Sequence, residues 1–192
     1  MTLRPEQIKA REYFLQKGTL LPAAPIRERV GAAFTALETF LDAVTDQEAR
    51  TRALPGEWTI QEVVDHLIET HRPSLAELRD LLHGRRPTAG PIPASLQSAD
   101  PMALRFENLV RDLRALHTDV LGVLSAAPDR MTDARAPLVM VINVKEPDGR
   151  EVPLHWIEEL DWKAYAVTAF RLHEVDHLNQ AKRTLKAARA AR

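Results

Sequence analysis

The chain has 192 residues, 45% of them hydrophobic and 28% charged, and its formal net charge is −1 at pH 7. These values predict a single globular domain over residues 1–192, and they argue against nucleic acid or an acidic membrane as the main partner. The chain has no cysteine, which excludes a disulfide framework, a thiolate metal site and a cysteine nucleophile.

The N-terminal segment is charged throughout and lacks the apolar run of a signal peptide. No apolar stretch approaches the roughly 18 residues that a membrane span needs. We therefore expect a soluble, cytoplasmic protein with no membrane partner. The same segment predicts a short first helix from about Arg4 to Gln16, which Gly18 ends.

Apolar residues at steps of three or four predict a long helix between Pro22 and Thr45. They are Ile26, Val30, Phe34, Leu37, Leu41 and Val44. A second long helix is expected to open at Thr59, where Thr59 and Glu62 form the capping box T-x-x-E. Pro73 falls inside this helix, where it removes a backbone donor and predicts a kink.

The segment GRRPTAGPIPASLQSADP, residues 84–101, is rich in proline and glycine and predicts a loop. It is long for a connection inside a compact domain, and such loops are often functional. Asp100 and Pro101 are a favourable N-cap and first-turn pair, so we expect a third long helix to begin there.

The character of the sequence then changes. The β-branched run LVMVINV, the turn EPDG and the segment REVPLHW predict a β-hairpin between Leu138 and Trp156. A last helix is expected from about Glu158 to Arg189. We therefore predict an all-α fold: a four-helix bundle with a short N-terminal helix and a β-hairpin inserted before the last helix.

The last helix carries the stretch RLHEVDHLNQ, which matches the H-E-x-x-H pattern of zinc peptidases. His173 and His177 are four residues apart, so both imidazoles point to one side of a helix and can reach one metal ion. Zinc peptidases of this class take their third ligand from downstream. After His177 the chain has no Asp, Glu, His or Cys, which rules out the common families of these peptidases. A third ligand must come from upstream.

The best upstream candidate is His66, in the stretch WTIQEVVDHLIETH. On a helical wheel it borders the apolar stripe of Val63 and Leu67, and therefore the core-facing surface. A lone histidine there is more often a packed core residue than a ligand. Together with His173 and His177, however, it gives three imidazoles on two core-facing helices, which leave an open coordination position as catalytic metal sites do.

The stretches WTIQEVVDHL (Trp58–Leu67) and HEVDHLNQ (His173–Gln180) resemble, in order and spacing, the DinB-like (damage-inducible, YfiT-type) superfamily of metal-dependent hydrolases and thiol transferases. The resemblance extends over nearly the whole chain. It implies a four-helix bundle with a divalent metal on His66, His173 and His177. It also implies transfer of low-molecular-weight thiols such as bacillithiol or mycothiol, or thiol-assisted isomerisation. The predicted hairpin is longer than the usual family connection, so the resemblance does not extend to substrate specificity.

The other polar residues near these histidines have weaker support. Glu69 lies one turn beyond His66 and is the predicted catalytic carboxylate near the open metal position. Glu174 and Asp176 lie to either side of the metal-facing direction, and we interpret each as a solvated surface charge in preference to a group that orients an imidazole. Surface or orienting roles are also the default for the remaining histidines, although the one at the exit of the hairpin can reach the mouth of the site. They are His71, His83, His117 and His155.

The sequence therefore predicts a metal-dependent hydrolase or thiol S-transferase that acts on a small molecule. Imidazole ligands suit several first-row ions, of which Zn²⁺ and Ni²⁺ are the leading candidates. Because the chain has no cysteine, a thiol nucleophile must come from a cofactor such as bacillithiol. The alternative is a non-enzymatic module, in which the metal stabilises the bundle or the pocket binds a stress-related small molecule. The apolar helix surfaces also predict a homodimer.

Overall fold

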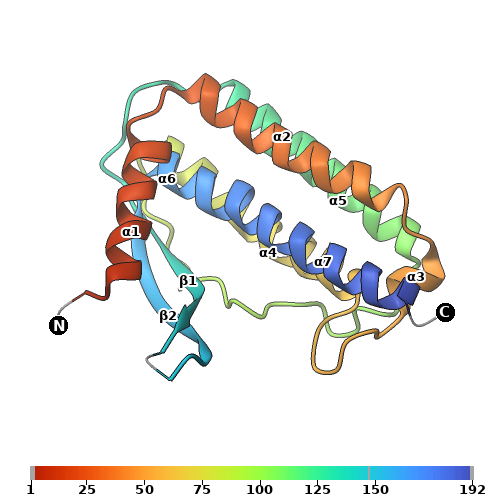
Figure 1. Ribbon diagram of the computed structural model, residues 1–192. Helices are drawn as coiled ribbons and strands as arrows, with labels where there is room; N and C mark the ends of the chain where they lie inside the picture. Colours follow the sequence, from red (N-terminus) through yellow and green to blue (C-terminus); the bar gives the residue numbers. More distant parts are fainter. Residues whose placement is uncertain (1–2, 147, 191–192) are drawn as a thin grey trace.

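The computed structural model describes residues 3–146 and 148–190. Four long helical segments run side by side, and a short helix and a two-stranded hairpin lie together at one end of them (Figure 1). The elements are α1 (Pro5–Phe14), the π-helical turn η1 (Leu15–Thr19), α2 (Ala23–Leu41), α3 (Asp46–Arg50), α4 (Ile60–Leu82), α5 (Phe106–Ser125), β1 (Ala136–Lys145), β2 (Glu151–Leu160), α6 (Trp162–Ala166), the π-helical turn η2 (Val167–Leu172) and α7 (His173–Ala190).

The long helices form a four-helix bundle. Helix α2 contacts α5 and α7, and α4 contacts the same two helices, so the four axes surround one core. Segments α6, η2 and α7 follow one another without a break and form the fourth helix. The bundle and the hairpin before its last helix confirm the predicted fold. None of the helices in the described residues is long and apolar enough to cross a membrane.

Helix α4 begins as the sequence predicts. The hydroxyl of Thr59 accepts a hydrogen bond from the backbone N–H of Glu62 (3.1 Å), and the carboxylate of Glu62 accepts one from the N–H of Thr59 (2.6 Å). This reciprocal pair satisfies two backbone donors that the first turn of a helix leaves free. It fixes where the helix starts, and so on which side of α4 His66 emerges.

The third long helix begins later than Asp100. Helix α5 starts at Phe106, and the residues between them form an irregular turn. Carbonyl groups in that turn accept hydrogen bonds from side chains of neighbouring elements: Gln61 reaches the carbonyl of Pro101 (2.9 Å), and Arg50 reaches that of Met102 (2.8 Å). These tertiary contacts satisfy the carbonyl groups without a helix, and so they override the local capping signal.

The last helix also begins later than predicted. Glu158 lies in β2, which continues to Leu160 because Leu160 pairs with Ala136 across the hairpin. Asp161 then caps the new helix, since its carboxylate accepts hydrogen bonds from two backbone N–H groups of α6 (3.0 Å each). The π-helical turn η2 interrupts the expected continuous α-helix immediately before His173. Such wide turns are common at functional sites.

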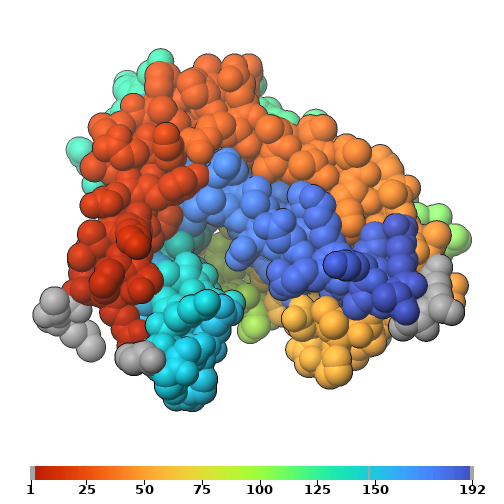
Figure 2. Space-filling view, viewed as in Figure 1, coloured from red at the N-terminus to blue at the C-terminus, as the bar shows by residue number. Residues whose placement is uncertain are grey.

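The hairpin is held over one end of the bundle. Arg11 on α1 forms an ion pair with Glu158 (2.9 Å), and Arg86, in the loop after α4, forms one with Glu159 (2.6 Å). Both partners belong to β2, which places β1 toward the bundle. In the space-filling view the hairpin and the loop after α3 stand on either side of a hollow beneath α7 (Figure 2).

Glu48 connects α3 to the end of α7 and predicts an acid-sensitive contact. Its carboxylate accepts hydrogen bonds from Arg189 (2.9 Å) and from the backbone of Thr45 (2.9 Å). The guanidinium of Arg189, followed by the Thr45 backbone, lowers the pKa of Glu48 from 4.5 to about 2. Between these values the unfolded chain binds the proton and the folded chain does not, so this contribution to stability is present above pH 4.5 and is lost as the pH falls toward 2.

We therefore expect Glu48→Gln to be less stable than the wild type at pH 7, and the difference to shrink between pH 4.5 and pH 2. Urea denaturation at several pH values measures both quantities. Glu107→Gln, at an exposed position of α5, is the control and should show no such trend. A difference between Glu48→Gln and wild type that stays constant down to pH 2 would contradict the assignment.

Candidate metal centre and cavity

The structure brings the three predicted ligands together. His66 extends from α4, and His173 and His177 extend from the first turn of α7. The Nε2 atom of His173 lies 3.0 Å from Nε2 of His66 and 3.1 Å from Nε2 of His177. Nitrogen ligands at the usual 2.0–2.1 Å from a common ion lie about 2.9–3.4 Å apart, depending on the angle between them. The separations therefore suit three ligands of one ion.

The hydrogen bond made by Nδ1 of each ring determines the tautomer of that histidine. Each ring donates a hydrogen bond from its Nδ1 side to an oxygen that can only accept. The acceptors are the carbonyl of Leu96 for His66 (2.7 Å) and the side-chain oxygen of Gln180 for His177 (2.9 Å). His173 has a hydrogen bond to the backbone of Ala169, and because its Nε2 faces the other two rings, we assign this contact to Nδ1. A neutral imidazole that donates from Nδ1 has a lone pair on Nε2. With this assignment the three Nε2 atoms present three lone pairs to one point.

Electrostatics favours the neutral rings. Burial lowers the pKa of His66, and burial together with the neighbouring imidazoles holds the pKa of His173 well below its usual range. Burial and His66 lower the pKa of His177 to about 4. At neutral pH the three rings are uncharged, which is the form that binds metal. Three lone pairs so close repel one another, and a cation at their centre turns that repulsion into coordination. The donor set therefore fits a divalent metal ion.

The loop before α5 shapes this centre. The side chain of Gln97 donates to the carbonyl of Glu62 (3.0 Å), and the backbone N–H of Ser98 donates to the carboxylate of Asp65 (2.9 Å). Both contacts anchor the loop to α4, and so they hold the carbonyl of Leu96 against His66. The sequence indicated a functional loop only through its length, and nothing in its pattern singled out Leu96.

Trp58 provides an aromatic wall beside the centre. Its ring lies 4.8 Å from that of His66 and stacks on that of His177 at 5.9 Å, measured between ring centroids. Gln180 completes the same side by holding His177. The position of Gln180, one helical turn from a ligand, was the sequence signal that could have identified it.

A cavity of about 890 Å³ opens next to the three histidines. Its walls come from α4, the long loop, the inner face of the hairpin, η2 and the start of α7. Apolar side chains such as Leu138, Met140 and Leu172 make up much of the lining. Among the described residues that line it, none is a lysine or arginine, and Asp176 is the one carboxylate. His155, on the hairpin, also lines the cavity, which agrees with the prediction that it can reach the mouth of the site.

The carboxylates lie elsewhere than the sequence suggested. Glu69 forms an ion pair with Arg72 and is not among the residues that line the cavity. Glu174 is fully buried, so its interpretation as a surface charge is wrong. Its partners are His117 and His71, which are also buried, so the default surface role is wrong for these two histidines as well. Two residues further on, Asp176 lines the cavity instead.

Residues 30–181 match the model of the DinB superfamily. The chain belongs to the DinB superfamily. The matched range runs from α2 into α7 and includes all three histidines of the centre. This confirms the resemblance carried by the stretches around His66 and His173. No curated protein and no solved structure matches the chain.

Proposed function

We propose that this DinB-superfamily protein is a metal-dependent enzyme that acts on a small, largely apolar molecule. The observation that carries the proposal is the convergence of three Nε2 lone pairs, from His66, His173 and His177, at the wall of a large cavity. Three imidazoles leave coordination positions open toward the cavity, as in catalytic rather than structural metal sites. The residues that orient each ring hold that arrangement before any substrate arrives.

A bound Zn²⁺, Ni²⁺ or similar ion supplies Lewis acidity, which lowers the pKa of a water or thiol. The protein's own groups hold the three rings neutral and correctly oriented, and Trp58 shields one side of the centre. Because the chain has no cysteine, thiol transfer needs a thiol from a small molecule. Activation of water would give hydrolysis, and activation of such a thiol would give S-transfer.

The lining of the cavity favours uncharged substrates. An anionic thiol such as bacillithiol would meet Asp176 there, and no lysine or arginine among the described wall residues could bind its carboxylates. Apolar residues of β1, including Leu138 and Met140, offer contact area to an uncharged molecule instead. We therefore favour a neutral thiol, or water, as the nucleophile and an apolar electrophile as its partner. A homodimer remains a separate prediction.

The test is a turnover assay on protein stripped with a chelator and reloaded with Zn²⁺ or Ni²⁺. Consumption of neutral and anionic thiols by apolar electrophiles, and hydrolysis of apolar esters, are followed at pH 7.5. We expect metal-dependent turnover, faster with neutral than with anionic thiols. In His66→Ala the turnover rate should fall by about a hundredfold or more, since losing a ligand removes the ion that supplies the chemistry.

His83→Ala is the matched control, because this histidine ends α4 and its ring contacts the backbone of Arg79 rather than the centre. It should keep wild-type turnover and metal content. If the wild type binds an ion through the three histidines yet shows no turnover in either assay, the enzyme proposal fails and the non-enzymatic alternative is favoured. Equal turnover in His66→Ala and wild type would also exclude the proposal of a metal-dependent enzyme.

A further inference from the structure

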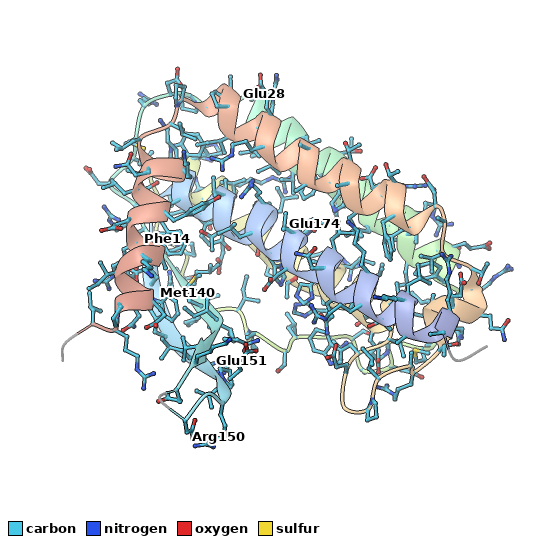
Figure 3. The ribbon with its side chains drawn as sticks, in the orientation of Figure 1. Phe14, Glu28, Met140, Arg150, Glu151 and Glu174 are labelled. Carbon is cyan, nitrogen blue, oxygen red and sulfur yellow. The ribbon has the colours of Figure 1, made fainter. Side chains whose placement is uncertain are left out.

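A second polar cluster lies inside the bundle, and each of the four long helical segments contributes one residue. These are Glu38 of α2, His71 of α4, His117 of α5 and Glu174 of α7. Glu174 and His71 are 0% exposed and His117 is 2% exposed. Figure 3 labels Glu174 on the side of α7 that faces α2 and α5. None of the four lines the cavity, and the cluster shares no residue with the candidate metal centre, which it adjoins where the ring of His71 lies 5.9 Å from that of His173 between centroids.

Four ligand-type atoms in this cluster face one another. Nε2 of His117 lies 3.1 Å from Oε1 of Glu174, and Nε2 of His71 lies 3.6 Å from Oε2 of the same carboxylate. Within the described part of the chain, none of these four buried atoms has a correctly aligned hydrogen-bond partner, and Nδ1 of His71 is a fifth such atom on the outer side of its ring. Buried polar atoms are nearly always paired, so four unpaired atoms at one point require an explanation.

The surrounding groups prepare both imidazoles as ligands. Nδ1 of His117 lies 2.6 Å from a carboxylate oxygen of Glu38, so it donates and can leave a lone pair on Nε2. Burial, together with nearby histidines, holds the pKa of His71 well below its usual range, so that ring is neutral. Phe34 stacks on His117 with ring centroids 3.8 Å apart and forms an apolar wall. One ligand atom from each of His71, His117 and Glu174 lies within 4.8 Å of the other two.

We propose that His71, His117 and Glu174 form a second divalent-cation site, distinct from the three-histidine centre. Two imidazole nitrogens and both oxygens of one carboxylate give four ligand atoms, and zinc binds both of these ligand types in proteins. The ion would connect α4, α5 and α7 through the middle of the bundle. This inference rests on the buried cluster alone and does not depend on the proposed enzymatic activity.

Charge balance distinguishes this site from a metal-free network. Nδ1 of His117 lies 2.6 Å from Glu38 and its Nε2 lies 3.1 Å from Glu174, so the metal-free alternative is a protonated His117 between two carboxylates. That network has a net charge of −1 and leaves Nε2 of His71 unpaired. A divalent ion with neutral histidines balances both carboxylates and occupies all four unpaired atoms. Buried charge is tolerated when it is compensated in this way.

The test counts ions in the full-length protein. Because the cluster is closed, an ion must enter during folding, so the protein is unfolded in guanidinium chloride with a chelator and refolded with excess Zn²⁺. Elemental analysis after gel filtration should then give two ions per chain. The double variant His66→Ala/His177→Ala should retain one ion, and Glu174→Gln should also retain one. Asp119→Asn, an equal change at an exposed position of α5, is the control and should retain two.

Two results would overturn the proposal: a single ion in the wild type together with none in the double histidine variant, or two ions in Glu174→Gln. If Glu174→Gln does not fold, crystals of the refolded wild type decide the question. Anomalous scattering recorded at the zinc edge should show one peak among the three cavity histidines and another between His71, His117 and Glu174. A peak at the first position only would leave the protonated His117 network as the explanation.

Discussion

Replacing His173 by alanine is expected to weaken metal binding at the three-histidine centre by about 10²–10³-fold. Structural Zn²⁺ sites with four ligands bind with about 10–16 kcal/mol, or roughly 2.5–4 kcal/mol per ligand, and every 1.4 kcal/mol is tenfold in affinity. His173 is the ring whose Nε2 lies within 3.1 Å of both other ligands, so its loss leaves His66 and His177 as a two-ligand site. Titration calorimetry with Zn²⁺ at pH 7 measures the change.

Two further variants are expected to affect metal affinity less than His173→Ala does. Gln180→Leu removes the acceptor that orients His177 and should weaken binding by about 10–100-fold, as loss of an orienting contact does. His83→Ala should leave the affinity unchanged. The titration reports the ion that exchanges through the open cavity, because the cluster around Glu174 is closed. An affinity in His173→Ala within a factor of three of wild type would show that this ring is not a ligand.

The bundle was predictable because helix periodicity and capping are local. The apolar stripe of α2 and the capping box at Thr59 act over a few residues, and the structure confirms both. The relation between His173 and His177 was predictable for the same reason, since it depends only on the spacing within one helix. His66 became a convincing partner only through its combination with that pair. The family resemblance then implied that His66 shares a metal site with His173 and His177, which helix periodicity alone cannot show.

Element boundaries were less predictable where tertiary contacts decide them. Asp100 is a favourable helix start in isolation, but side chains from α3 and α4 bind the following carbonyls and hold the turn open. Glu158 can adopt a helix as readily as a strand, and the register of the hairpin assigns it to β2. In both cases the deciding partner lies tens of residues away in the sequence, so no local pattern contains it.

The interior of the bundle was misjudged for a related reason. A helical wheel gives the direction of Glu174 relative to His173 correctly, since both residues lie in α7 after the π-helical turn η2. The wheel, however, describes one helix at a time. Glu174 points away from the metal centre, as predicted, yet that side of α7 is not solvent: it faces α2 and α5, which contribute Glu38 and His117. Helix packing, not residue pattern, turns this charge inward.

Glu174 is expected to be the most sensitive position for stability. Its carboxylate is 0% exposed and faces His117 at 3.1 Å and His71 at 3.6 Å. Glu174→Ala leaves two buried imidazoles without this partner and opens a void beside them. Removing one member of a buried charged pair costs about 3–5 kcal/mol, because the remaining polar group keeps its desolvation penalty. Urea denaturation at pH 7 should show a loss of this size.

Its neighbour Asp176 provides the matched control, since the two acids lie two residues apart on the same helix. The side chain of Asp176 is exposed and lines the cavity. The protein around its carboxyl group partly removes it from water and raises its pKa, so the negative charge of Asp176 does not favour the folded state. Asp176→Ala should therefore change the unfolding free energy by no more than about 0.5 kcal/mol. Glu174→Gln keeps the shape and should lie between the two alanine variants. If Glu174→Ala lowers the unfolding free energy by less than 1 kcal/mol, the buried cluster does not stabilise the bundle. Water or a rearranged His117 would then have replaced the missing carboxylate.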